Sequence, residues 1–141
     1  MSEILLNRFV DIYQRLDKTN LHTLREVYSD HVHFEDSLHK LDGIDDLINY
    51  FEGQYKNLSS CSFTVLEAHQ QLENAWLVWE MRFSHPKLNG GSQICVPGAS
   101  HLRLNDKITY HRDYVDMGQV LYEHIPLLGR AIRWIKRSAV Q

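Results

Sequence analysis

The sequence predicts an α+β domain in which helices come first and a mixed or antiparallel sheet follows. Apolar residues recur at helical spacing in three segments before residue 59, whereas period-two alternation and turn residues dominate residues 60–117. The 141 residues, 43% of them hydrophobic and 23% charged, match the size and composition of one folded domain. We therefore expect residues 1–141 to form a single domain, with residues 119–141 as a C-terminal helical extension.

Three helices are predicted in the N-terminal part of the chain. In the first, Leu5, Phe9 and Ile12 recur at helical spacing. A second, short helix is expected over residues 20–29, where an asparagine can cap the start. The third is expected over residues 44–58, where two aspartates favour the positive N-terminal end of the helix. Each segment has one apolar stripe and is therefore expected to cover a face of the sheet.

Strands are expected on both sides of the third helix. Val32 and Phe34 alternate with polar residues, which predicts a short strand that runs into a loop within residues 30–40. Asp42-Gly43 marks a turn before the helix. The remaining strands are predicted as an antiparallel meander over residues 61–72, 75–85, 92–104 and 107–117.

Residues 119–141 no longer show strand alternation, and their spacing predicts a helix that begins near Pro126 or Gly129. Leu128, Ile132 and Ile135 have helical spacing, and arginines occupy another face of the same helix. We expect the apolar stripe to pack over the open end of the domain, with the arginines in solvent. Docking on a membrane surface or on a partner is the alternative.

Composition excludes several classes of protein. The net charge of −3 argues against a general nucleic-acid binder, and no apolar run approaches the ~20 residues that cross a bilayer. Cys61 and Cys95 form no CxxC pair, which excludes zinc ribbons and thioredoxin-type sites. Two thiols in a chain without a signal peptide predict a reducing, cytoplasmic location.

The stretch 107-KITYHRDYVDMG-118 has the period of a strand, yet it carries His111, Arg112, Asp113 and Asp116 within six residues. Side chains alternate across a strand, so His111 and Asp113 share one face while Arg112 and Tyr114 share the other. Periodicity alone does not say which face is buried. In the strand over 75–85 the choice is clear, because one face consists of Leu77, Trp79, Met81 and Phe83.

The chain resembles the nuclear transport factor 2-like superfamily, in particular its SnoaL-like members, the steroid Δ-isomerases and limonene epoxide hydrolase. The likeness lies in 28-YSDHVHFEDS-37, in Asp42-Gly43 before the third helix, and in 107-KITYHRDYVD-116. It implies a cone-shaped, curved sheet packed on three N-terminal helices, with an apolar pocket between sheet and helices. It also implies a homodimer formed through the sheet.

The resemblance names two candidate catalytic carboxylates. Asp113 matches the base of the epoxide hydrolases, which implies that Asp113 and His111 face the pocket while Asp116 faces outward. Asp36 matches the position of the isomerase base, and the alternative is that Asp36 caps the following turn. An apolar pocket would raise the pKa of either carboxylate and suit it to proton transfer.

The sequence departs from both families at other positions. The arginine and second aspartate of the epoxide hydrolases fall at Met81 and Phe83, and the neighbouring Arg82 has the wrong parity. The isomerase tyrosine falls at Ile12, so Tyr13 reaches the pocket only if the helix is rotated, and the isomerase acid falls at Ser100. The ligand-binding set expected from this comparison is Trp79, Met81, Phe83, Ser100, His111, Tyr13, Phe51 and Tyr55.

Three functions remain open at this point. The first is cofactor-free acid/base catalysis of the isomerase, cyclase or hydrolase type on a small hydrophobic molecule, with Asp113 or Asp36 as base. The second is a binding protein for a small apolar ligand, and the third is a dimeric accessory protein. His31 and His33 share a strand face with Glu35, and His39 or His111 could join them, but we expect an exposed face and no metal or other cofactor.

Overall fold

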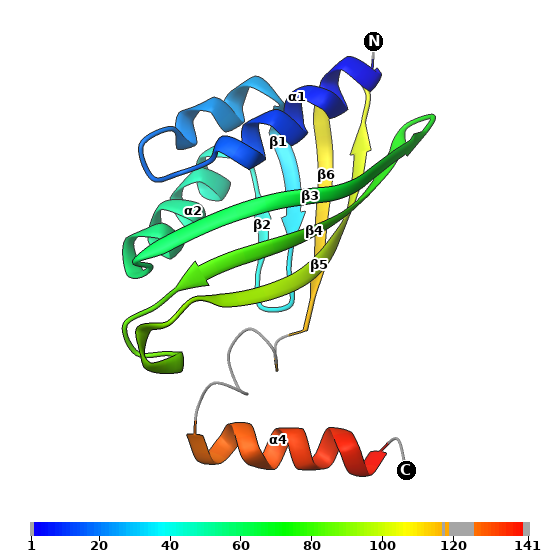
Figure 1. Cartoon of the computed structure of the whole chain (residues 1–141). Coiled ribbons are helices and arrows are strands. Elements are labelled where there is room, and N and C mark those ends of the chain that lie inside the picture. The colour runs from blue at the N-terminus through cyan, green and yellow to red at the C-terminus, as the bar shows by residue number, and fades with distance from the viewer. Residues whose placement is uncertain (1, 117, 119–125, 140–141) are drawn as a thin grey trace.

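The computed structural model describes residues 2–116, 118 and 126–139. Helices α1 and α2 lie on one side of a long, curved sheet, as Figure 1 shows. The two N-terminal helical elements are α1 (Ser2–Arg15) and the 3₁₀-helix η1 (Leu21–Glu26), and the next elements are β1 (Tyr28–Glu35), β2 (Lys40–Asp42) and α2 (Ile44–Asn57). The chain continues as β3 (Ser60–Gln71), β4 (Asn74–Ser84), a short 3₁₀-turn η2 (Asn89–Gly91), β5 (Ile94–Leu104), β6 (Ile108–Val115) and α4 (Pro126–Ala139).

The sheet is mixed, with the strand order β2-β1-β6-β5-β4-β3. β1 runs parallel to β6, and all other neighbours are antiparallel. The parallel pair joins the N-terminal part of the chain to its last strand. The predicted α+β class and the order of its elements are therefore confirmed.

Two local predictions were wrong. The second helix does not extend over residues 20–29, because the chain leaves the 3₁₀-helix at Glu26 and Tyr28 already pairs with Ile108 of β6. Burial of the Tyr28 side chain in the core favours the strand over the helix. Residues Lys40–Asp42 form a strand on the edge of the sheet, and the turn follows at Gly43, whose φ of 94° suits glycine.

The core lies between the concave face of the sheet and the helices. α1 contributes Phe9 and Tyr13, and α2 contributes Leu47 and Phe51, all at helical spacing along one face. The sheet contributes alternate residues from every long strand. Each of these large side chains stabilises the fold by about 1.5–3 kcal/mol when fully buried.

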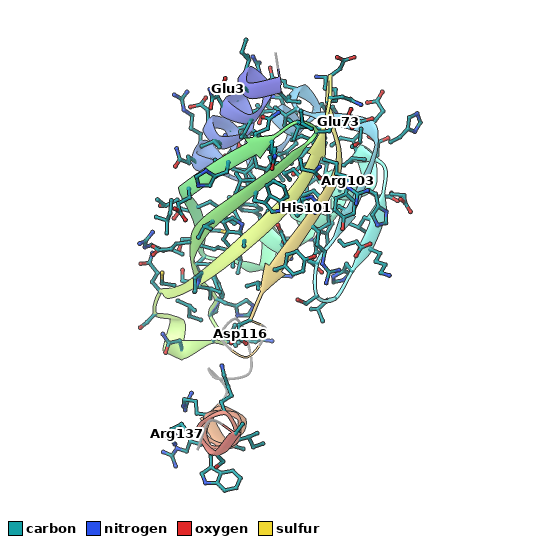
Figure 2. All side chains as sticks on the ribbon, turned by 90° about the vertical axis from the view of Figure 1, so that its right-hand side faces the viewer. Glu3, Glu73, His101, Arg103, Asp116 and Arg137 are labelled. Atoms are coloured by element: carbon teal, nitrogen blue, oxygen red, sulfur yellow. The ribbon has the colours of Figure 1, made fainter. Side chains whose placement is uncertain are left out.

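The convex face of the sheet carries stacked rings and ion pairs. Trp76 stacks on His101 with ring centroids 5.4 Å apart, and His33 stacks on Tyr110 at 6.0 Å. The Arg103 guanidinium lies 5.0 Å from the centre of the Tyr110 ring. Figure 2 labels His101 and Arg103 on β5.

His33 gives this face a pH-dependent stability. Hydrogen bonds from its ring to Asp42 (2.7 Å) and Glu35 (2.8 Å) raise the pKa of His33 above 6.5 and lower that of Glu35 below 4.5. The histidine contribution is complete below pH 6.5 and is lost as the pH rises through the folded pKa; the glutamate contribution is complete above pH 4.5 and is lost on acidification. In urea unfolding at several pH values, the stability difference between wild type and His33→Gln should therefore be largest between these two values. A difference that stays constant with pH would contradict this assignment.

The C-terminal helix α4 is exposed. Trp134 and Ile135 are 64% and 57% exposed, so the expected packing of Ile135 over the open end of the domain is wrong. Lys136 forms an ion pair with Asp116 at 2.9 Å, at the point where β6 has ended. Residues 119–125 of the predicted extension lie outside the described residues, and no described helix is long and apolar enough to span a membrane.

Candidate functional site

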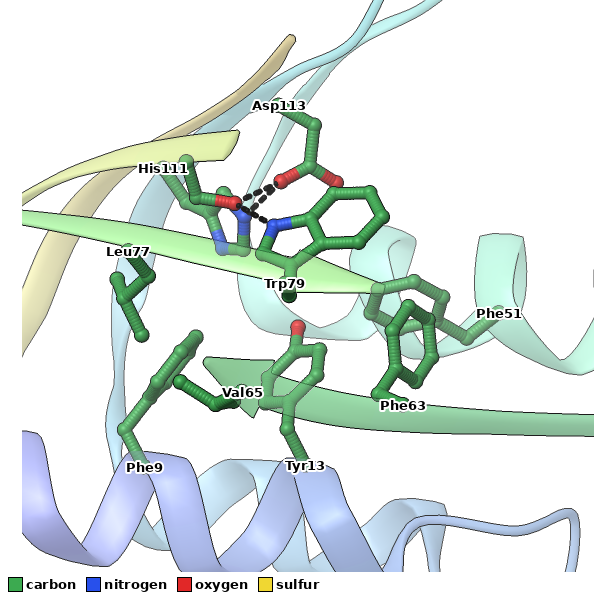
Figure 3. Close-up of a pocket in the computed structure, with 10 residues that line it drawn as sticks. Phe9, Tyr13, Phe51, Phe63, Val65, Leu77, Trp79, His111 and Asp113 are labelled. Carbon is green, nitrogen blue, oxygen red and sulfur yellow. Dashed lines mark hydrogen bonds and ion pairs between the residues drawn. The ribbon is translucent and has the colours of Figure 1, made fainter. Parts of the chain in front are cut away.

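A small inner cavity lies between α1 and the concave face of the sheet (Figure 3). Its volume of about 30 Å³ suits a single water molecule. Apolar side chains from α1, α2, β3 and β4 form most of its wall, and the polar groups come from β5 and β6. The lining consists of Phe9, Tyr13, Phe51, Phe63, Val65, Leu77, Trp79, Ser100, His111 and Asp113.

A larger pocket, which we call the vestibule, adjoins the inner cavity. It has a volume of about 270 Å³ and shares Phe51, Phe63, Trp79 and Asp113 with the cavity. Asp113 therefore stands at the boundary between the two spaces. The remaining vestibule lining is Phe34, Asp36, Ser37, Leu38, Tyr50, Gln54, Leu58, Met81, Phe83, His85, Leu88 and Val115.

The vestibule continues into a side branch near the C-terminal end of α2. The branch also measures about 270 Å³ and adds Tyr55, Asn57 and Cys61 to walls that it otherwise shares with the vestibule. The hydroxyl of Tyr55 is buried and makes no hydrogen bond of normal geometry to any described residue. The Cys61 thiol is its polar neighbour, and burial raises the pKa of that thiol to about 11.

One carboxylate oxygen of Asp113 accepts hydrogen bonds from described residues, and the other accepts none. Its Oδ1 accepts hydrogen bonds from Ser100 Oγ at 2.5 Å and from His111 Nε2 at 2.5 Å. Ser100 Oγ in turn accepts a bond from Trp79 Nε1 at 2.9 Å. No described residue hydrogen-bonds Oδ2, and the side chain is 23% exposed, so Oδ2 is available to a ligand.

A second chain of hydrogen bonds reaches Asp113 through His111. The Tyr13 hydroxyl lies 2.6 Å from the Tyr28 hydroxyl, which lies 2.6 Å from His111 Nδ1. Burial raises the pKa of both tyrosines well above 10, so both remain hydroxyls and donors. With Tyr28 donating to Nδ1, a neutral His111 carries its proton on Nε2 and donates it to the Asp113 carboxylate.

Local irregularities of two strands position these groups. Thr109 is an extra residue in β6, because Leu104 pairs with Ile108 but Arg103 pairs with Tyr110. This bulge lets Ile108 and His111 both face inward. Asp113 follows His111 on the same face.

Gly98 makes room for the Trp79 indole on the neighbouring strand. Gly98 of β5 pairs with Trp79 of β4, and a Cβ at position 98 would lie 2.3–2.6 Å from the Trp79 ring. The ring can therefore lie against the backbone of β5 only because residue 98 is glycine. This placement brings Nε1 to Ser100.

Asp36 also lines the vestibule, but its oxygens are engaged. Oδ1 accepts the backbone N–H groups of Leu38 and His39, each at 2.8 Å, and Oδ2 accepts the Tyr50 hydroxyl. This is the geometry of the turn-capping alternative. It leaves Asp113 as the carboxylate with an open oxygen.

The other residues expected from sequence have distinct places. Met81, Phe83, Phe51 and Tyr55 line the vestibule or its branch, and Tyr13 lines the inner cavity. Arg82 lies on the opposite face of the sheet, where it bonds Glu80 at 2.7 Å. The epoxide hydrolase arrangement is therefore absent from the described site.

Sequence reasoning missed Tyr28, Phe63 and Tyr50. The apolar alternation of Phe63 with Val65 was a usable signal for the inner face of β3. Tyr28 lay in a segment that was predicted to be helical, so its partner His111 was not evident. Among the described residues, no grouping of three or more His, Cys, Asp or Glu side chains could hold a metal ion.

Comparison with known proteins agrees with this architecture. The sequence profile of the SnoaL-like domain matches residues 7–111, which is most of the chain and includes His111. The chain belongs to the SnoaL-like domain family. A search of curated proteins gave no match.

Several solved structures share this fold. A proposed SnoaL-like polyketide cyclase from Jannaschia sp. CCS1 superposes with a TM-score of 0.71 at 13% identity, over 83% of this chain and 88% of that one. An NTF2-like protein of unknown function from Burkholderia pseudomallei K96243 gives 0.73 at 10% identity, over 84% and 93%. A protein with a ketosteroid isomerase-like fold from Catenulispora acidiphila, in complex with trimethylamine, gives 0.70 at 15% identity, over 83% and 88%. At these identities the likeness concerns the fold.

Proposed function

We propose that this SnoaL-like protein binds a small apolar carbonyl compound in the vestibule and uses Asp113 as a general base without a cofactor. The observation that carries the proposal is the asymmetry of the Asp113 carboxylate. Oδ1 is held by Ser100 and His111, whereas Oδ2 is open at the boundary of an apolar pocket. A base fixed in one orientation beside an apolar binding space is what proton abstraction from carbon requires.

The reaction that fits is proton transfer next to a carbonyl group. Oδ2 would take the proton from the carbon, the electron pair of the C–H bond would form a C=C bond, and the π pair of the carbonyl would move onto its oxygen to give an enolate. Return of the proton to the same or another carbon regenerates the carboxylate. Tyr50 and Trp79 already donate to Asp36 and Ser100, so the described site has few free donors for the enolate oxygen. It therefore suits compounds whose C–H group is already acidic because two carbonyls flank it.

Substitution of Asp113 by asparagine tests this proposal. Asparagine has nearly the same side-chain shape as aspartate but cannot act as a base. The variant should therefore incorporate deuterium from D₂O into a small apolar 1,3-diketone about 10²–10⁴-fold more slowly than wild type. NMR would follow the exchange. Asp106→Asn, in the exposed turn between β5 and β6, is the control and should exchange at the wild-type rate. Equal rates for wild type and Asp113→Asn would remove the catalytic role.

A binding protein without catalysis is the second candidate, favoured by one feature of the side branch. The buried Tyr55 hydroxyl, whose described polar neighbour is the weakly bonding Cys61 thiol, can donate to a polar atom of a ligand that is otherwise apolar. On this reading Asp113 and Tyr55 anchor the two ends of an elongated molecule. Weaker affinity for such a ligand in Asp113→Asn, together with no exchange activity in wild type, would favour this candidate.

A ligand in the side branch should change the alkylation rate of one of the two cysteines. Cys61 lines the branch, whereas Cys95 is exposed and lies on the outer face of β5. A bound apolar ligand should slow alkylation of Cys61 severalfold, as resolved by peptide mass spectrometry, and leave Cys95 unchanged. Equal protection of both thiols, or of neither, would exclude a ligand in the branch.

The predicted homodimer through the sheet stays a prediction, as does the cytoplasmic location. The convex face offers exposed apolar side chains for such contact, namely Trp76, Val78 and Tyr114. Both cysteines are free thiols, which suits a reducing compartment.

A further inference from the structure

The charge of this protein is unevenly distributed. Helix α4 carries four basic residues and no acidic residue within Pro126–Ala139, although the whole chain has a net charge of −3. The body of the protein is thus acidic and its last helix strongly basic. Figure 2 shows Arg137 on this helix, beyond Asp116 and the end of the sheet.

The basic and apolar side chains of α4 occupy different sides. At 3.6 residues per turn, Arg130, Arg133 and Arg137 fall within an arc of about 60°. Trp134 and Ile135 lie outside that arc and are 64% and 57% exposed. Figure 1 shows α4 beyond the end of the sheet and away from α1 and α2, so neither helix covers these side chains.

We propose that α4 docks on the surface of an anionic phospholipid bilayer. A basic helix with an exposed tryptophan can lie in the headgroup region, with apolar side chains in the acyl boundary and arginines on the phosphates. Each basic residue near an anionic surface strengthens binding through its attraction to the lipid phosphates. The helix lies on the surface, since no described helix is long and apolar enough to span the bilayer.

Charge argues against two other occupants. A second copy that met the first through α4 would bring two helices of like charge together. A nucleic acid would be repelled by the body of the protein and would leave Trp134 and Ile135 in water. An anionic bilayer offers phosphates to the arginines and an apolar boundary to Trp134 and Ile135.

Docking would bring the pocket to the source of its ligand. β6 carries Asp113, its Val115 lines the vestibule, and the chain reaches α4 soon afterwards. An apolar compound dissolved in the bilayer would then enter the vestibule without crossing much water. This consequence rests on the proposed function, whereas the docking itself does not.

Co-sedimentation of the full chain with vesicles tests the proposal. Binding to vesicles of phosphatidylglycerol and phosphatidylcholine should exceed binding to phosphatidylcholine alone by at least about tenfold, and should weaken as the salt concentration rises from about 0.1 M to about 0.5 M. The double change Arg130→Glu with Arg137→Glu should reduce binding by at least about tenfold. Trp134→Ala should reduce binding to both kinds of vesicle.

A matched variant controls for net charge. Arg8→Glu with Arg15→Glu makes the same change of charge on exposed residues of α1, and should keep binding within about twofold of wild type. Equal binding by the two double variants, equal binding to neutral vesicles, or no binding at all would overturn the proposal. A dimer in ultracentrifugation that only the α4 variant loses would instead identify a second copy as the occupant. Asp113→Asn should bind vesicles normally, so failure of the base assignment and failure of docking are separate results.

Discussion

Replacing Gly98 by alanine is expected to lower the free energy of unfolding by about 1–3 kcal/mol, one of the two largest effects that we predict. The added Cβ would lie 2.3 Å from the Trp79 ring, and the clash involves a rigid indole packed against the backbone of β5. Trp79 must then move, which breaks its hydrogen bond to Ser100 and changes the inner cavity. Urea unfolding gives the stability, and tryptophan fluorescence reports the displacement of the indole.

Gly53→Ala is the matched control for this change. Gly53 lies within α2, and a Cβ there would meet no atom within 4 Å. Alanine in a helix interior is favoured over glycine by up to about 1 kcal/mol, so this variant should be as stable as wild type or more so. Equal stability of Gly98→Ala and Gly53→Ala would show that Trp79 tolerates a side chain at position 98.

Tyr28→Phe is the second change with a large expected effect. It removes one oxygen from the core but leaves two buried groups, the Tyr13 hydroxyl and His111 Nδ1, without their partner. An unsatisfied buried polar group costs about 1–3 kcal/mol, so we expect a loss of that size in urea unfolding. Tyr114→Phe, on an exposed residue of the next strand, should have no measurable effect.

The same variant tests whether Tyr28 is a positioning residue for Asp113. Without the donor at Nδ1, His111 can carry its proton on either nitrogen, and one of the two forms offers no N–H to Asp113. The ¹⁵N shifts of His111 should change from a single tautomer to a mixture, and the pH profile of deuterium exchange should shift. A stability loss with an unchanged tautomer and pH profile would make Tyr28 purely structural.

The fold could be predicted from sequence because its strongest signals are local. Leu77, Trp79, Met81 and Phe83 alternate without interruption, and that pattern admits one buried face. The predicted helix over 44–58 closely matches α2. Turn residues predicted the ends of the strands from β3 to β6 to within two residues.

Prediction failed where a distant strand decided local structure. The segment around Tyr28 has apolar residues at helical spacing, but pairing with Ile108 of β6 and burial of the ring give a strand instead. Pairing of Leu41 with Phe34 likewise makes a strand of residues expected to lead into a turn. Neither partner lies in the local sequence window.

The residues of the site could be predicted from sequence better than the hydrogen bonds that join them. The resemblance named Asp113, His111 and Ser100, while sequence parity left the face of β6 open. The bulge at Thr109, which sets that face, depends on how β5 pairs with β6. Asp36 was recognised as either a base or a cap, and only its three hydrogen bonds give it the geometry of a cap.

By itself, the sequence determined the order of helices and strands, the inner face of β4 and the amphipathic character of the last helix. These features follow from side-chain spacing within one element, which the chain carries regardless of its fold. Only the tertiary structure decided that Asp113 has one bound and one open oxygen, that Tyr28 reaches His111, and that Trp79 rests on Gly98. The contacts of Asp113 with Ser100, of Tyr28 with His111 and of Trp79 with Gly98 each join two strands, and their geometry depends on sheet register and bulges that no local pattern encodes.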